Sequence, residues 1–252
     1  MTRVTAILNQ KGGVGKTTTA QALTAALKVT KHSVLAIDAD AQSNLTYSMG
    51  GELEAPGLYE AMKDGSEPLI QTLPFGDLLG ANTRLFYADR EFISRYGYSS
   101  IKDVIMPLLP KYDHVIIDCP PNLGVMTENA LEFATDVIIP VQPSVFPTIG
   151  LSQLFKTISS VQKKDNPGLS IAGILYTLVD KRTTTHRDYM EQINELAKAN
   201  GIHVYETVIY NAIALQEAAS DKASIYEHAP KSQVSKLYVQ FAKEYLLQEF
   251  NK

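Results

Sequence analysis

The chain has 252 residues, 45% of them hydrophobic and 20% charged, a balance typical of a globular protein with a sizeable core, and we expect one α/β domain spanning residues 1–252. A net charge of −4 excludes a global basic field of the kind that attracts nucleic acid, whereas a single cysteine excludes an internal disulfide framework, argues against a multi-cysteine iron–sulfur site and favours the cytoplasm. Because there is no run of 18 apolar residues and no room for a signal peptide before the first predicted strand, we expect no stable membrane insertion.

The first informative stretch is a glycine-rich loop, residues 10–18, between a β-prone run at 4–8 and a helix-like run at 19–27. This context suits phosphate binding, because glycines let backbone N–H groups converge where the helix directs its positive end. Lys16 adds a full positive charge, and the Thr17 hydroxyl can ligate Mg²⁺. The simpler alternative is a glycine-rich turn that binds nothing. We predict that the loop binds nucleotide phosphates through Gly12, Gly13, Val14, Gly15, Lys16, Thr17 and Thr18.

The loop departs from the ordinary pattern at its entry. Gln10 occupies the place of the first glycine, and a second lysine, Lys11, follows it. Two lysines so close together are costly unless anionic charge neutralises both, which favours a polyphosphate ligand. The stretch 11–18 resembles the deviant Walker A loop of the ParA/MinD ATPase family. The resemblance implies catalytic roles for Lys16 and for Lys11, which in that family reaches across a nucleotide-sandwich dimer to the partner's phosphates.

A second strand is predicted at residues 33–38, an almost wholly apolar run that ends at Asp38 and is soon followed by Asp40. Carboxylates at the C-terminal end of a buried strand are costly unless they face a site, although a solvated loop rich in turn-forming residues is the alternative. The segment resembles the family's Asp-x-Asp-Pro-Gln segment, with Ala41 in place of proline. The resemblance implies that Asp40 is catalytic, orienting the attacking water, and belongs to the metal site.

Residues 50–110 carry weaker signals. We predict a short helix at 57–62, a strand ending near 78–81, and a helix at 101–109 stopped by Pro110. Four aromatic residues of this region are predicted to pack in the core: Tyr87, Phe92, Tyr96 and Tyr98. No chemistry is assigned to this part of the chain.

A third apolar strand, within residues 112–118, ends in Asp118 and is stopped by two prolines. A carboxylate at a strand tip that holds Mg²⁺ through water is the Walker B arrangement, which is a strong signal when a phosphate loop precedes it. Cys119 is predicted to be a small buried residue, because no sequence neighbour activates it. Residues 118–121 also resemble the family's Asp-Cys-Pro-Pro segment. The predicted metal residues are Thr17, Asp40 and Asp118.

The resemblance continues beyond this strand. Residues 122–131 match a switch region that in the family lies near the γ-phosphate and the dimer interface. A strand is predicted at 136–142, and the helix expected around 150–154 resembles the family's Gly-Leu-Ser-Gln-Leu helix.

The last third contains a predicted strand at 171–178 and a helix at 184–200 that is capped by Gly201. Residues 207–211 are interpreted as the loop on the nucleobase side. In the family this loop contains two arginines, and one of them belongs to the surface that binds DNA non-specifically. Both are missing here. The residues predicted to contact the base are Tyr210 and Asn211.

Two terminal helices are predicted, at 215–222 and 231–250. The second carries three lysines that we interpret as a candidate DNA-binding stripe: Lys231, Lys236 and Lys243. Acidic and basic residues are balanced over this third of the chain, so an ordinary solvated face is the alternative.

The resemblance implies a doubly wound, mostly parallel sheet with helices on both faces, of the deviant Walker A class of P-loop NTPases. It further implies a ParA/Soj-type partition ATPase that uses ATP and Mg²⁺, forms a homodimer with ATP, is stimulated by a ParB-like partner and binds DNA non-specifically. A related ATPase that positions a non-DNA cargo is the main alternative. A MinD-like membrane switch and a polysaccharide-associated tyrosine kinase rank lower, because a basic amphipathic C-terminal anchor and a terminal tyrosine cluster are both missing.

Overall fold

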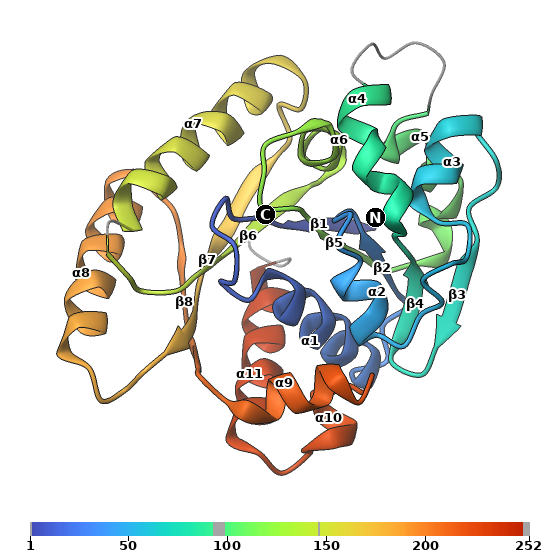
Figure 1. The fold of residues 1–252 in the computed structure, drawn as a ribbon. Coiled ribbons are helices and arrows are strands. Elements are labelled where there is room, and N and C mark those ends of the chain that lie inside the picture. The colour runs from blue at the N-terminus through green and yellow to red at the C-terminus, as the bar shows by residue number, and fades with distance from the viewer. Residues whose placement is uncertain (1, 93–98, 146, 249–252) are drawn as a thin grey trace.

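The computed structural model of the chain describes residues 2–92, 99–145 and 147–248. Within these residues, eight strands form one sheet in the order β3-β4-β2-β5-β1-β6-β7-β8, in which β3 is antiparallel to β4 and the other neighbours are parallel (Figure 1). The strands are β1 (Arg3–Ile7), β2 (Val34–Asp38), β3 (Ile70–Leu73), β4 (Gly76–Leu79), β5 (His114–Asp118), β6 (Asp136–Val141), β7 (Ser170–Val179) and β8 (Val204–Tyr210). The predicted fold class is confirmed.

Helices cover both faces of the sheet (Figure 1). One layer contains α3 (Leu58–Asp64), η1 (Thr83–Tyr87), α4 (Ala88–Glu91), α5 (Ile101–Ile105), η2 (Met106–Lys111), α6 (Val125–Phe133), α7 (Pro147–Lys164) and α8 (Thr184–Ala199). The other contains α1 (Lys16–Val29), α2 (Asn44–Ser48), α9 (Ile213–Ser220), α10 (Ile225–His228) and α11 (Gln233–Leu247). No helix within the described residues is long and apolar enough to cross a membrane.

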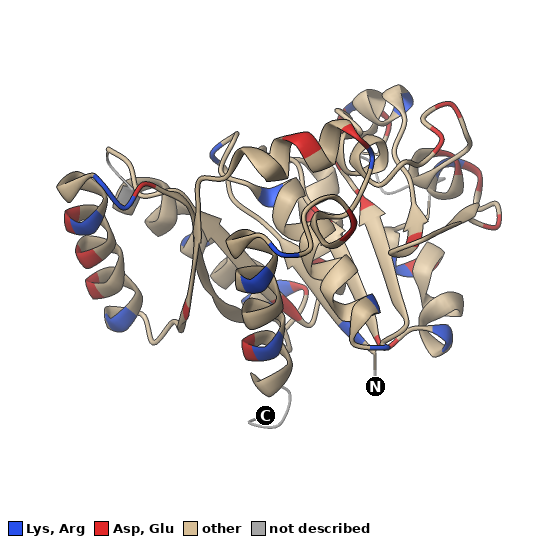
Figure 2. Ribbon diagram, turned by 90° about the horizontal axis from the view of Figure 1, so that it is seen from below, with Lys and Arg blue, Asp and Glu red and all other residues tan. Residues whose placement is uncertain are grey.

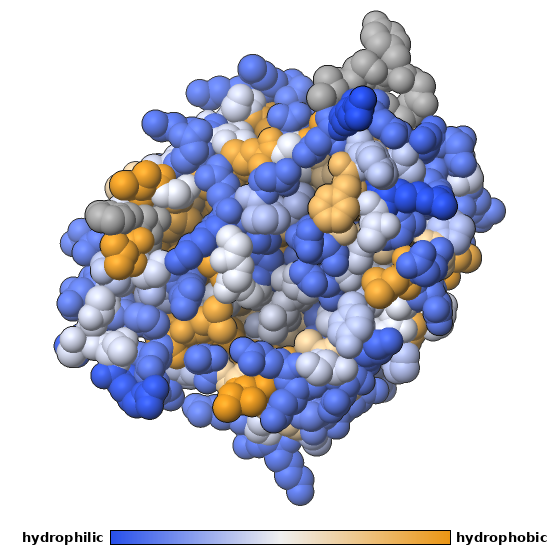
Figure 3. Space-filling view, viewed as in Figure 1, coloured by the Kyte–Doolittle hydropathy of each residue, from blue (hydrophilic) through white to orange (hydrophobic). Residues whose placement is uncertain are grey.

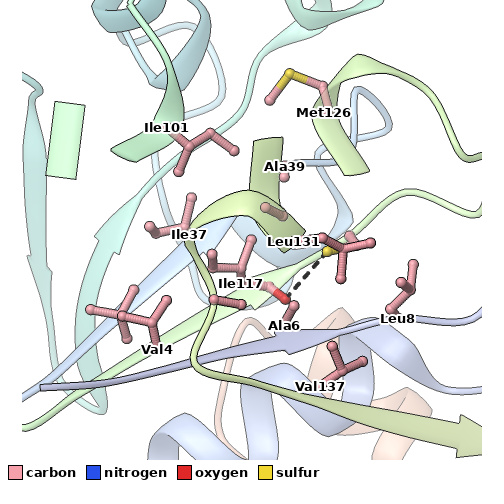
Figure 4. Close-up of a cluster of buried hydrophobic side chains, with 14 of the residues drawn as sticks. Val4, Ala6, Leu8, Ile37, Ala39, Ile101, Ile117, Met126, Leu131 and Val137 are labelled. Atoms are coloured by element: carbon pink, nitrogen blue, oxygen red, sulfur yellow. Dashed lines mark hydrogen bonds between the residues drawn. The ribbon is translucent and has the colours of Figure 1, made fainter. Parts of the chain in front are cut away.

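The sheet divides the hydrophobic core into two layers, because successive side chains of a strand point to opposite faces. In β1, Val4 and Ala6 pack on one face and Ile7 on the other. Figure 4 shows the first of these layers, where side chains of neighbouring strands meet Leu131 of α6. Cys119 is fully buried within this layer, as predicted, and burial raises the pKa of its thiol far above the ordinary value.

Several sequence-based expectations about local structure are wrong. The helix predicted at 101–109 stays α-helical only to Ile105 and continues as the 3₁₀ helix η2, because Pro107 lacks the N–H that another α-helical turn needs. Residues 207–210 belong to β8, so the predicted base-side loop begins only at Asn211. Strand β3 was not predicted.

The aromatic residues of the weakly predicted region divide into buried and exposed positions. Phe92 is buried as expected, but Tyr87 is 55% exposed at the end of η1, so its predicted core packing is wrong. Tyr96 and Tyr98 lie outside the described residues.

Parallel pairing brings the predicted functional segments to one edge of the sheet. In the strand register, Asp118 at the end of β5 lies opposite Ile7 of β1 and Asp38 of β2. The loops that follow these three strands therefore meet at the C-terminal edge, where open α/β sheets bind ligands.

Candidate nucleotide-binding site

The loop between β1 and α1 borders a cavity of about 450 Å³. Gly13 and Gly15 have φ angles of 71° and 85°, in the left-handed region that glycine adopts without Cβ strain. Gly15 is the N-cap of α1 and has no side chain to satisfy the N–H groups of the first turn. Those N–H groups and the positive end of the helix dipole are therefore available to an anion.

The cavity brings together most of the residues predicted from sequence to surround the nucleotide: Gly12, Gly13, Gly15, Lys16, Thr17, Thr18, Asp40 and Asn211. Val14 is instead buried behind the loop, where its carbonyl accepts a hydrogen bond from Thr177. Its backbone contact with phosphate stays a prediction.

Lys16 is a buried cation that the protein pairs only weakly. Its side chain is 7% exposed, and its Nζ donates to the carbonyl of Lys11 at 3.4 Å. Burial lowers the pKa of Lys16, whereas the nearby carboxylates of Asp118 and Asp40 oppose that effect. A polyphosphate in the cavity would supply the close anionic partner that the described residues do not.

Thr17 and Asp118 form the corner of the site predicted to hold the metal. The Thr17 hydroxyl donates to Oδ2 of Asp118 at 2.7 Å, while the buried Oδ1 of Asp118 has no hydrogen-bond partner among the described residues. Burial, and then the neighbouring charge of Asp38, raise the pKa of Asp118 well above its ordinary value. A buried carboxylate oxygen without a donor is costly, and a hydrated cation would satisfy it. The corner therefore fits Mg²⁺, which Thr17 Oγ1 and the Asp118 carboxylate would hold.

Asp38 lies beside Asp118 and supports the segment that carries Asp40. Its Oδ2 accepts hydrogen bonds from the N–H and hydroxyl of Thr46 at 2.8 and 2.7 Å, and its Oδ1 accepts one from the Asp40 N–H at 3.2 Å. Thr46 Oγ1 also accepts a bond from the Ala81 N–H at 2.9 Å. Burial raises the pKa of Asp38 to about 6. Sequence reasoning gave this residue no individual role, although a second acid at the tip of a buried strand was the available signal.

Asp40 faces the same cavity as Lys16 and Thr17. Its Oδ1 accepts a hydrogen bond from the Gln42 N–H at 3.0 Å, and its carbonyl accepts one from the Ser43 N–H at 2.9 Å. These turn contacts fix the direction of the carboxylate. A carboxylate in this position can accept a hydrogen bond from a water molecule beside the phosphates.

Lys11 lies outside the cavity that Lys16 lines. Its side chain is exposed, and its Nζ donates to Ser144 Oγ at 2.8 Å, in the loop after β6. The backbone N–H of Lys11 donates to Oδ1 of Asn9, whose amide in turn donates to the Pro140 carbonyl. The two lysines of the loop therefore point to different surroundings.

The far end of the cavity has the apolar character expected around a nucleobase. It is lined by Ile209, Leu215 and Tyr238, with the polar side chains of Asn211 and Gln216 nearby. Ile209 and Asn211 belong to the segment predicted to lie on the base side, whereas Leu215, Gln216 and Tyr238 were not predicted, because α9 and α11 contribute them from other parts of the chain.

Tyr210 does not line the cavity, in contrast to Asn211 beside it. The Lys181 ammonium lies 3.7 Å from the centre of the Tyr210 ring, which occupies that ring face. A base contact by Tyr210 stays a prediction that this geometry does not favour.

The tip of β7 supplies a wall that the sequence did not reveal. Thr177 donates from Oγ1 to the Val14 carbonyl at 2.7 Å, and the next residue, Leu178, lines the cavity with a positive φ of 53°. The phosphate loop is thus anchored from behind by a strand that begins more than 150 positions later.

Lys231, Lys236 and Lys243 are all exposed, and none forms an ion pair within the part of the chain that the structure describes. In Figure 2, α11, which leads to the C-terminus, carries basic and acidic residues next to one another. DNA binding by the three lysines therefore stays a prediction.

Comparison with known proteins places these features in a family. A family model described as an AAA domain matches residues 2–171. The chain is 36% identical to the sporulation initiation inhibitor protein Soj of Bacillus subtilis, over 97% of this chain and 98% of that protein. It is 35% identical to the chromosome partitioning protein ParA of Caulobacter vibrioides, over 98% and 95% of the two chains.

A solved structure shares the architecture. Cobyrinic acid a,c-diamide synthase from Mycobacterium smegmatis, with bound ADP and magnesium, has a TM-score of 0.83 and 35% identity, over 100% of this chain and 96% of that one. The family match includes both the phosphate loop and the Asp118 strand, and the full-length relatives extend it through the base-side helices. The chain therefore belongs to the ParA/Soj/MinD family of P-loop ATPases.

Proposed function

We propose that the chain is a switch for plasmid or chromosome partition that dimerises with ATP bound and separates after hydrolysis. The observation that carries this proposal is the separation of the two loop lysines: Lys16 lines the cavity, whereas Lys11 lies outside it on Ser144. A loop lysine that does not face its own cavity is available to the phosphates of a facing subunit. The similarity to the chromosome partitioning protein ParA of Caulobacter vibrioides supports the partition role.

In the proposed reaction, the N–H groups of the phosphate loop and Lys16 bind the ATP phosphates. Mg²⁺, held by Thr17 and through water by Asp118, would neutralise phosphate charge. Asp40 orients the attacking water, and Lys11 from the partner subunit offsets the charge that develops in the transition state. Hydrolysis is slow in this scheme until a ParB-like partner completes the site.

Exposed hydrophobic residues near the cavity support a dimer that closes over it. Phe86 lines a second cavity that includes Asp40, Val145 follows the Ser144 that binds Lys11, and Ile213 lies between residues of the base end. Their side chains are all more than half exposed. Figure 3 shows hydrophobic patches separated by hydrophilic residues over this face, which is typical of reversible rather than permanent association.

The test uses two variants that fail for different reasons. Asp40→Ala is expected to bind ATP and accumulate as a dimer without turnover, whereas Lys11→Ala is expected to bind ATP but neither dimerise nor hydrolyse it. A mixture forms hybrid dimers in which one composite site lacks both groups and the other retains both. ATP turnover restored in the mixture supports action across the dimer, and hybrid dimers without turnover would contradict it.

The cargo is the finer part of the proposal. DNA is the first choice because of the partition relatives, with cytoplasmic protein associating with the nucleoid through Lys231, Lys236 and Lys243. A non-DNA cargo remains the second candidate, because Glu244 stands next to Lys243 on α11 and the family's arginines are missing near Asn211. ATP-dependent binding to DNA of random sequence, falling steeply as salt rises, would favour DNA. Equal binding without nucleotide, or a flat salt response, would count against it.

A further inference from the structure

The segment 83–92, to which sequence reasoning assigned no chemistry, lies against the helix that follows the Asp118 strand. Its core residues Leu85 and Ala88 pack in the same layer as α6, and α4 lies beside α6 in Figure 1. On the outer side of this contact, Asp89 lines a cavity of about 290 Å³ together with Asp40 and Asn122.

The carboxylate of Asp89 caps α6 from outside the helix. The N-cap residue of α6 is Gly124, which has no side chain that could accept a bond from the first turn. Asp89 Oδ1 accepts the Val125 N–H at 2.9 Å, and its Oδ2 accepts a bond from the Asn122 amide at 3.2 Å. A negative charge at this end of α6 also suits the helix dipole.

Gly124 leaves the space that this contact needs. A Cβ at this position would lie 2.4 Å from Oδ1 of Asp89, which is a severe overlap. The backbone of Gly124, with φ of −88°, is one that other residues adopt readily, so conformation does not require glycine here. The close approach of Asp89 does.

The capped loop also forms part of the nucleotide site. Pro121 lines both the nucleotide cavity and the smaller cavity, and so does Asp40. Thr127 of α6 donates from Oγ1 to the Asn122 carbonyl at 2.7 Å. The loop is therefore held by Asp89 and α6 on its outer side, while its inner side is a wall of the site beside Asp40.

We propose that Asp89 is a positioning residue for ATP hydrolysis, which fixes the loop at 120–124 against Asp40 by capping α6. The inference rests on the proposed role of Asp40 in orienting water. Because Asp89 contacts neither the phosphate loop nor the base end, its loss should affect turnover rather than ATP binding. The same contact gives segment 83–92, with its exposed Phe86, a direct connection to the rate of hydrolysis.

The first experiment measures steady-state ATP turnover of the full chain with Mg²⁺. Asp89→Ala is expected to lower kcat about tenfold with KM changed less than about twofold, since a small misplacement of reacting groups costs this much or more. Asp89→Asn keeps an acceptor for the Val125 N–H and should recover most of the loss. Arg90→Ala, an exposed neighbour on α4, is the matched control and should behave as wild type.

The second experiment uses Gly124→Ala, whose new methyl group should displace the Asp89 carboxylate and reproduce the fall in kcat. In the Asp89→Ala background the overlap disappears, so Gly124→Ala should cause little further loss. Additive losses, or a raised KM with unchanged kcat, would overturn the inference.

The two proposals fail in different ways. Wild-type turnover in Asp89→Ala, beside a loss of turnover in Asp40→Ala, would reject the positioning role and leave the proposed function intact. Full turnover in Asp40→Ala would reject the role of Asp40 and this inference together.

Discussion

Buried charges lie at both ends of the central strands, and the two groups are paired very differently. At the N-terminal end, the Arg3 guanidinium donates to both carboxylate oxygens of Asp136 at 2.7 and 3.1 Å, and to the Tyr245 carbonyl at 2.6 Å. At the C-terminal end, Lys16 donates to a carbonyl of its own loop, and Asp118 has an oxygen without a partner among the described residues. The charges of the first group find their partners within the protein, whereas those of the second would find theirs in a bound ligand.

This difference shows where the fold is stabilised and where it stores unfavourable energy. A paired buried charge is strongly destabilising only when its partner is removed, whereas an unpaired one already destabilises the folded state. Of the four non-glycine residues with positive φ in the described chain, Ser43 adjoins and Leu178 lines the nucleotide cavity, whereas Lys31 and Lys222 lie in exposed turns after α1 and α9. The C-terminal edge is therefore the functional end of the sheet, and substitutions at the two ends should have opposite consequences.

The largest effect is expected from breaking the buried ion pair between Arg3 and Asp136. Asp136→Ala would leave the Arg3 cation buried beside Tyr245, which should lower the free energy of unfolding by about 3–5 kcal/mol. Urea unfolding monitored by circular dichroism measures this change. Arg182→Ala, which breaks an exposed pair with Asp180, is the control and should leave the midpoint nearly unchanged. Equal midpoints for the two variants would contradict the assignment of Arg3 and Asp136 to stability.

Lys16→Ala tests the other end of the sheet. Loss of a charge-assisted contact worth about 1.5–3 kcal/mol should weaken binding of a fluorescent ATP analogue at least about tenfold. The free energy of unfolding without nucleotide should not fall, because burial disfavours the charge of Lys16 in the empty site. Lys28→Ala, on the exposed end of the same helix, is the control. Unchanged affinity would reject the phosphate-loop assignment.

A pH titration of stability sharpens the comparison at the N-terminal end. Burial, then the nearby His32 and Arg3, lower the pKa of His114 to about 4. Its pKa in the unfolded chain is about 6.5, so the unfolded state binds more protons between these values and stability falls as pH drops through this window. Between pH 7.5 and 5 the loss attributable to His114 should be about 2 kcal/mol. His114→Gln should flatten this part of the unfolding profile, and parallel profiles for the two proteins would contradict the buried neutral imidazole.

The features that can be predicted from the sequence are those formed by residues that follow one another in the chain. The phosphate loop, Asp40 and Asp118 each occur in a short segment with strand and helix signals around it. Apolar runs of the parallel strands indicate that helices cover both faces of the sheet. The cap by Asp89 joins residues more than 30 positions apart and has no local signature. The same is true of the base end, where α9 and α11 arrive from another part of the chain. Tyr87 is predicted to be a packing residue, yet it is the last residue of a short 3₁₀ helix and its side chain is 55% exposed.

The smallest effect is expected at Thr177, which connects the stable part of the fold to the nucleotide site. Its buried hydroxyl donates a hydrogen bond to the Val14 carbonyl, and this bond holds the phosphate loop, whose N–H groups await a ligand. Thr177→Val keeps the shape but removes the donor, so the carbonyl is left without this bond and the loop loses an anchor, at a cost of about 1 kcal/mol. If the anchor preorganises the loop, ATP-analogue affinity should fall about fivefold, since 1.4 kcal/mol corresponds to a factor of ten. Thr177→Ser retains the hydroxyl and should keep most of the affinity. A valine variant that loses stability but binds the analogue as wild type would show that this contact belongs with Arg3 and Asp136, as part of the stable frame.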